Sequence, residues 1–145
     1  MLYSHTQVVP SGALVGIGAV ATLGALMTPG KMKLVGGAIV AALMSTFRSL
    51  TVSIDNQEIV LRFGEWFEPK RIALASVKSC QLARMSPLNG WGIHFVGNGW
   101  LYNVYGLDAV EIEHLDGTKT FIGTDEPRVL CEAIMQAMVL EPSRH

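Results

Sequence analysis

The first 49 residues contain no aspartate or glutamate and only three basic residues, Lys31, Lys33 and Arg48. Two long apolar runs fill this segment, separated by the turn sequence Thr-Pro-Gly-Lys at 28–31. Every carboxylate side chain follows it, in a remainder with the alternating pattern of β-strands. An apolar, glycine-rich N-terminal third joined to a charged remainder predicts a membrane hairpin that carries one small domain.

The two apolar runs differ in length. Residues 8–27 are twenty consecutive uncharged residues, about 30 Å long as a helix, which matches the hydrocarbon core of a bilayer. Residues 34–47 supply only fourteen, although flanking residues can extend them. We therefore expect transmembrane helices at about 8–28 and 32–49. The alternative is a buried pair of core helices, but so small a chain has little other mass to cover two wholly apolar helices.

Small residues recur four apart in both expected helices, a spacing that lets helix backbones approach closely in lipid. They are Gly12, Gly16, Gly37, Ala41 and Ser45. They can serve packing within the hairpin or contact with a second copy. Neither apolar run contains an ionisable residue, and this absence disfavours a transporter or channel.

From Leu50 onward, apolar and polar residues alternate with a period of two, which is typical of half-buried strands. The sequence Asp-Asn-Gln-Glu at 55–58 has the chemistry of a tight hairpin turn. Other gaps are punctuated by glycine, proline and asparagine. The expected strands are 50–55, 59–63, 67–74, 77–84, 92–96, 100–104, 109–115 and 119–124.

The last element has a helical period. Thr124 or Asp125 can cap its start, and an apolar stripe follows that includes Leu130 and Ile134. We expect this amphipathic helix to end at about Leu140 and to pack one face on the sheet. The predicted organisation is a hairpin over 1–49, a strand-rich domain over 50–140 and a tail over 141–145.

Four segments carry a resemblance to a known family. They are Gly-Trp-Gly-Ile at 90–93, Gly-Trp-Leu-Tyr-Asn-Val at 99–104, Ala-Val-Glu-Ile at 109–112 and Ile-Gly-Thr-Asp-Glu-Pro at 122–127. In order and spacing they resemble the bacterial pleckstrin-homology-like domain proteins that carry N-terminal transmembrane helices. The resemblance implies a barrel of about seven antiparallel strands closed by one C-terminal helix. It also implies a bacterial inner-membrane location with the domain in the cytoplasm, and it carries over no catalytic residue.

Aromatic residues gather between positions 91 and 105. Trp91, Trp100, Tyr102, Asn103 and Tyr105 are the candidate binding residues. Packing in the core is the alternative role for these rings, since alternate positions of neighbouring strands share one face.

The charge balance argues against broad attraction to nucleic acid or anionic lipid headgroups. From Leu50 onward eight lysines and arginines face twelve carboxylates, so we expect no nucleic-acid partner. Phosphoinositide binding is not expected either, because the connection at 55–58 carries acid, and Lys70 and Arg71 are the sole adjacent basic pair in this part.

The residues of known reaction centres are not arranged here at their usual spacings. The histidines His5, His94, His114 and His145 lack metalloprotease spacing. Cys80 and Cys131 form no zinc motif, and we expect two buried thiols. Glu111 and Glu113 fit a solvated strand face better than an acid–base pair. We therefore predict no metal, no cofactor and no enzymatic activity.

The expected function combines these interpretations. It is a membrane-anchored, non-catalytic interaction module held at the surface of the lipid bilayer, which binds a protein partner or forms a homo-oligomer. The alternative is a membrane domain that senses a small ligand or a lipid through a pocket lined by its aromatic residues.

Overall fold

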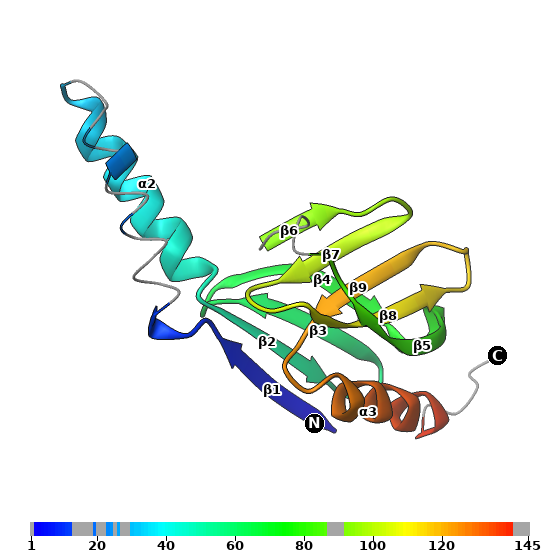
Figure 1. Cartoon of the computed structure of the whole chain (residues 1–145). Coiled ribbons are helices and arrows are strands. Elements are labelled where there is room, and N and C mark those ends of the chain that lie inside the picture. Colours follow the sequence, from blue (N-terminus) through cyan, green and yellow to red (C-terminus); the bar gives the residue numbers. More distant parts are fainter. Residues whose placement is uncertain are drawn as a thin grey trace.

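The computed structural model describes residues 2–12, 19, 23–24, 26, 30–86 and 92–140. In these residues nine strands form two sheets (Figure 1). Helix α3 lies along the sheets, whereas helix α2 projects away from them (Figure 1). The strands expected from residue 50 onward are all present, each within one residue of its predicted ends.

The first sheet is a four-stranded antiparallel meander. Its strands, in spatial order, are β1 (Tyr3–Val8), β2 (Ser49–Ile54), β3 (Glu58–Phe63) and β4 (Phe67–Ala73). The turn between β2 and β3 closes as the sequence predicts, because Asp55 Oδ1 accepts hydrogen bonds from the backbone N–H groups of Gln57 and Glu58.

The second sheet has five strands in the order β5-β8-β9-β7-β6. They are β5 (Val77–Arg84), β6 (Gly92–Phe95), β7 (Gly99–Asn103), β8 (Asp108–His114) and β9 (Lys119–Gly123). Neighbouring strands are antiparallel except β7 and β9, which are parallel. A short 3-10 helix, η1 (Leu74–Ser76), connects the first sheet to the second.

One hydrophobic core joins both sheets and α3. Alternate residues of β2 and β3 supply one side of it, which explains the period of two in this part of the sequence. The largest fully buried side chains are Phe63, Leu50, Ile54, Ile59, Leu61, Leu101, Ile112, Ile122, Leu130 and Ile134.

Helix α3 (Pro127–Leu140) supplies the remaining side of the core. Its buried residues are Leu130, Cys131, Ile134 and Ala137, and they form the predicted apolar stripe. The helix packs against β5, β8 and β2. At its start, the backbone N–H of Glu126 donates to Thr124 Oγ1 at 3.1 Å, so Thr124 satisfies one of the free amides there.

The N-terminal segment does not form the predicted two-helix transmembrane hairpin. Residues that were expected to lead into the first helix instead form β1, which pairs with β2 along its whole length. Helix α2 (Met32–Thr46) has 15 residues, about 22 Å, and is shorter than the bilayer core. None of the helices within the described ranges is long and apolar enough to cross a membrane. The described residues therefore contradict the prediction of a transmembrane hairpin and the integral membrane location that depended on it.

The predicted barrel also differs from the observed architecture. About seven antiparallel strands were expected, whereas the described residues form nine strands in two sheets with one parallel pair. Most of the predicted first helix at 8–28, and the tail at 141–145, lie outside the described residues.

Candidate functional site

Phe95 on β6 and Trp100 on β7 form an exposed aromatic pair. The two residues are directly opposite in the β6–β7 register. Their ring centroids lie 5.5 Å apart with an interplanar angle of 67°, close to edge-to-face. Phe95 is 61% exposed and Trp100 is 49% exposed. Trp100 was expected either to bind a partner or to fill the core, and at this exposure the ring stays available for contact.

Tyr102 and Asn103 have structural roles. Tyr102 is buried in the core, and its burial raises the pKa of its phenol. Asn103 is also buried; its amide Nδ2 donates to the carbonyl of Gly106 at 3.0 Å, and its Oδ1 accepts the backbone N–H of Tyr105 at 3.2 Å. Asn103 therefore fixes the loop between β7 and β8.

The remaining candidate binding residues lie apart from the aromatic pair. Tyr105 is partly exposed in the β7–β8 loop, and its carbonyl accepts a hydrogen bond from Gln7 Nε2 at 2.9 Å. Trp91 lies outside the described residues. The five candidates thus do not form one site in the described structure, and Trp100 is the member placed beside another exposed ring.

Strand β6 is an edge strand, and in the described part of the chain it pairs with β7 alone. The N–H of Val96 donates to the carbonyl of Gly99 at 2.9 Å and closes the β6–β7 hairpin. Since hydrogen-bonded and non-hydrogen-bonded pairs alternate in an antiparallel ladder, the backbone groups of Ile93 and Phe95 point away from β7. They are placed to pair with an added strand.

The other described sheet edges carry features that discourage strand addition. Strand β4 has the sequence Phe-Glu-Pro-Lys-Arg-Ile-Ala, with charges and a proline. Strand β5 carries Lys78 and Arg84 and packs against α3. Strand β1 is tied by side chains to the start of α3. By contrast, β6 reads Gly-Ile-His-Phe and has no lysine, carboxylate or proline.

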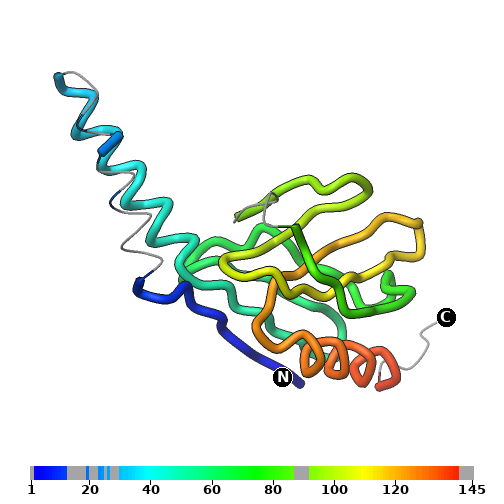
Figure 2. The backbone as a smooth tube through the Cα atoms, in the orientation of Figure 1, coloured from blue at the N-terminus to red at the C-terminus, as the bar shows by residue number. Residues whose placement is uncertain are grey.

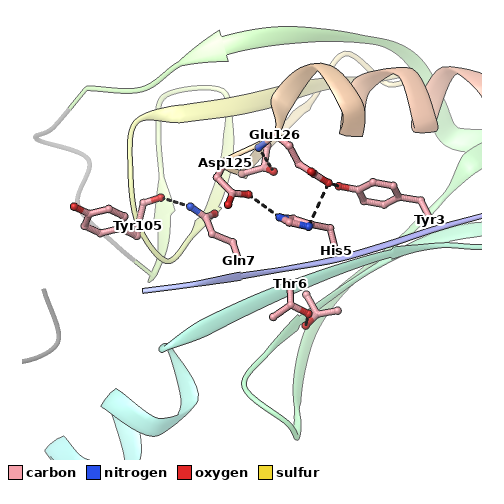
Figure 3. A network of polar contacts seen from close by, with 9 residues as sticks. Tyr3, His5, Thr6, Gln7, Tyr105, Asp125 and Glu126 are labelled. Atoms are coloured by element: carbon pink, nitrogen blue, oxygen red, sulfur yellow. Dashed lines mark hydrogen bonds and ion pairs between the residues drawn. The ribbon is translucent and has the colours of Figure 1, made fainter. Parts of the chain in front are cut away.

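A polar network links β1 to the start of α3 (Figure 3). His5 Nε2 lies 2.6 Å from Asp125 Oδ1, and His5 Nδ1 lies 3.3 Å from Glu126 Oε1. The hydroxyl of Tyr3 donates to the same Glu126 oxygen at 2.5 Å. Burial and this hydrogen bond raise the pKa of Tyr3. Tyr3 and His5 lie two residues apart and therefore on the same face of β1, and both side chains contact the start of α3.

The network holds two elements together and offers little to a substrate. A catalytic histidine needs one ring nitrogen free to exchange a proton with substrate, whereas both nitrogens of His5 face carboxylate oxygens. Beside them, buried Gln7 donates to the Tyr105 carbonyl, while its Oε1 has no hydrogen-bond partner among the described residues.

A second polar cluster lies on β8 and β9. Glu111 Oε1 lies 2.7 Å from Lys119 Nζ, and Glu111 Oε2 accepts a hydrogen bond from Gln81. The hydrogen bonds from Lys119 and Gln81 lower the pKa of the Glu111 carboxyl. Glu111 lies on the face of β8 opposite the core residues Val110 and Ile112, as the alternation predicts, but it is buried there and not solvated.

The described side chains provide no metal centre and no activated thiol. No group of three or more histidine, cysteine, aspartate or glutamate side chains within the described ranges is placed to hold a metal ion. Cys131 is buried and Cys80 is half-buried, and both are free thiols. Burial and the neighbouring Cys131 raise the pKa of Cys80, which disfavours the reactive thiolate.

Comparison with known proteins adds no identification, because no family model and no curated protein matches the chain. The resemblance to bacterial pleckstrin-homology-like proteins stays a prediction.

Sequence reasoning missed Tyr3 and His5, because they precede an apolar run that was interpreted as a membrane helix. Tyr3, His5 and Gln7 alternate in burial with Ser4, Thr6 and Val8 in the structure, but the residue types show no apolar–polar alternation that would have predicted the strand. It also missed Phe95 as a surface residue, because the alternation on β6 predicts a core position. Whether a side chain at the end of a sheet is buried depends on the elements that pack over it. The alternation of apolar and polar residues along the strand does not encode those elements.

Proposed function

We propose that this chain is a non-catalytic protein-binding module that accepts a β-strand at the open edge of β6. The observation that carries the proposal is the exposed Phe95–Trp100 pair beside an uncharged edge strand. Backbone hydrogen bonds to an added strand supply affinity in this mode of recognition, and side-chain contacts supply specificity.

The aromatic pair suits the role of an anchor. Tryptophan is enriched among the residues that dominate binding energy at protein interfaces, since its ring buries a large area at low entropic cost. Phe95 packs edge-to-face on Trp100, with the ring centroids 5.5 Å apart. Because this contact already restricts the Trp100 ring, less conformational entropy is lost when a partner binds. Two partly exposed rings on adjacent strands thus present a surface next to the backbone groups that a partner strand would use.

The added strand can come from another protein or from a second copy of this chain, and the same chemistry serves both. In a second copy, β6 would pair with its own symmetry mate and extend the five-stranded sheet across a two-fold axis. Light scattering coupled to size-exclusion chromatography, over a hundredfold range of concentration, distinguishes the two sources because only self-pairing depends on the concentration of this chain.

The experiment compares four full-length baits: wild type, Trp100→Ala, Phe95→Lys and Trp66→Ala. Trp66 is the matched control, because it is 73% exposed and lies in the turn after β3, away from β6. Proteins retained from the source lysate by wild type and Trp66→Ala, but not by the other two, are identified by mass spectrometry. The purified partner is then titrated against each variant by calorimetry.

We expect Trp100→Ala and Phe95→Lys to weaken the purified partner's binding at least about tenfold. Circular dichroism must show that both variants keep the β-rich fold. Unchanged affinity in both folded variants, with no concentration-dependent dimer of the wild type, contradicts the proposal.

A further inference from the structure

A cavity of about 320 Å³ lies where β4 and η1 meet the turn between β8 and β9. Its volume is at the lower end of the range for small-molecule sites. The polar side chains that line it are Lys70, Arg71, Ser76, His114, Asp116 and Thr118. This cavity contains none of the residues of the β6 edge, so it is independent of the proposed protein-binding surface.

The two cations of the cavity differ in what they contact. Arg71 is occupied, because Nη1 lies 2.5 Å from Glu58 Oε1 and Nη2 lies 2.9 Å from Glu68 Oε2. Lys70 lies opposite core residue Leu61 in the β3–β4 register and is half-buried. Within the described residues, no carboxylate forms an ion pair with Lys70. A lysine side chain without a carboxylate partner among the described residues is available to an anion from outside.

His114 shows that the charge of Lys70 reaches across the cavity. Burial of the ring and the positive charge of Lys70 both lower the pKa of His114, while Asp116 opposes them. One ring nitrogen, Nε2, lies 2.7 Å from Thr120 Oγ1. The half-buried imidazole therefore lies beside an uncompensated positive charge and can present its Nδ1 to a ligand.

Asp116 is the negative group that lines the same cavity. Its Oδ1 accepts hydrogen bonds from Thr118 N at 2.9 Å and from Thr118 Oγ1 at 2.6 Å. These bonds lower the pKa of Asp116 and keep it charged. Because Asp116 repels an incoming anion, we expect the anion to lie closer to Lys70 than to the Asp116 carboxylate.

We propose that this cavity binds the anionic group of a small molecule, a carboxylate or a phosphate, with Lys70 as its charge partner and His114 as its hydrogen-bond donor. A single lysine acts as a point charge and does not select between the two groups by geometry. Because Lys70 is the cation of the cavity that has no ion pair within the described residues, we expect its affinity for an anion to be modest and to fall as salt is added.

The test follows the imidazole resonance of His114 by NMR during titrations of the full-length protein with inorganic phosphate and, separately, with sodium acetate. A bound anion stabilises the imidazolium form, so the apparent pKa of His114 should rise along a saturable curve. A larger response to phosphate than to acetate assigns the ligand group as a phosphate, and the reverse assigns a carboxylate.

Three variants decide the outcome. Lys70→Gln should weaken binding at least about tenfold and should itself raise the pKa of His114, because a nearby positive charge is removed. Lys70→Arg keeps the charge and should keep binding even if the glutamine variant folds poorly. Lys78→Gln removes the same charge from β5, outside the cavity, and should bind as wild type. Unsaturable shifts of equal size in wild type and folded Lys70→Gln would mean an adventitious ion only and would overturn the proposal.

Discussion

Glu111 shows how a carboxylate on the outer face of a sheet can be buried by its polar neighbours. Its burial is compensated by Lys119 at 2.7 Å and by the amide of Gln81. Sequence reasoning assigned Glu111 to a solvated face, because a glutamate between Val110 and Ile112 fits simple alternation. The partners that permit burial come from β9 and β5, and a local pattern does not contain them.

The lowered pKa of Glu111 makes a prediction about pH. A carboxyl group with a lowered pKa in the folded state adds stability above its ordinary pKa, and this stability is lost as the pH falls through the lowered value. Glu111→Gln should therefore be less stable than wild type at pH 7 and should lose less stability between about pH 5 and pH 3.

Urea unfolding at a series of pH values measures this difference. Glu132→Gln is the control, because Glu132 is exposed on α3. Parallel pH profiles for Glu111→Gln and wild type would show that the ion pair with Lys119 adds no stability.

At the scale of elements, the junction between β9 and α3 depends on close backbone approach. A Cβ atom on Gly123 would lie 2.0 Å from Asn103 Oδ1, the atom that holds the loop after β7. The glycine before the expected helix cap suggested only a tight connection. The requirement for glycine arises because β7 and its loop pack against this position.

Gly123→Ala should lower the free energy of unfolding by about 2 kcal/mol, because overpacking forces Asn103 out of its hydrogen bonds. Gly37→Ala is the matched control, since a Cβ there meets no atom within 4 Å and α2 should gain about 0.5–1 kcal/mol from the better helix former. Urea denaturation checks both values. If Gly123→Ala is as stable as wild type, the close packing against Asn103 is not a constraint.

Helix α2 lies where the sequence predicts the second helix, but it is not long and apolar enough to cross a membrane. Most of its side chains are apolar and exposed, and Leu34 is 80% exposed. Thr46 is its buried residue, at the end where the helix meets β2. A hydropathy average reports that a segment is apolar, but it does not report where a helix begins or whether the preceding residues pair as a strand. In the folded chain β1 pairs with β2, and this pairing makes the residues before the first apolar run a strand.

At the scale of the whole molecule, the N-terminal strand contacts the start of the last helix. Tyr3 and His5 on β1 contact Glu126 and Asp125, about 120 residues later in the sequence. Figure 2 shows the start of the N-terminal strand close to the start of the C-terminal helix. The contacts of Tyr3 and His5 therefore tie the start of β1 to the start of α3.

His5→Ala should loosen this closure. We expect a loss of about 1 kcal/mol in unfolding free energy, because a charge-assisted pair of contacts is removed while β1 keeps its ladder with β2. Hydrogen exchange followed by mass spectrometry should show faster exchange of the β1 amides in His5→Ala than in wild type, with the β3 amides unchanged. Ser4→Ala, exposed on the opposite face of β1, is the control. Equal exchange rates in His5→Ala and wild type would mean that strand pairing alone holds β1.

The sequence by itself determined the strands from β2 to β9, the turn at Asp55 and the apolar stripe of α3. Each of these is set by local properties: side-chain periodicity, turn chemistry and helix capping act within a few residues. The tertiary structure decided the pairing of β1 with β2, the parallel β7–β9 pair and the burial of Glu111. It also decided the exposure of Phe95 and the cavity beside Lys70, because each depends on residues that are distant in the chain and meet only when the sheets pack.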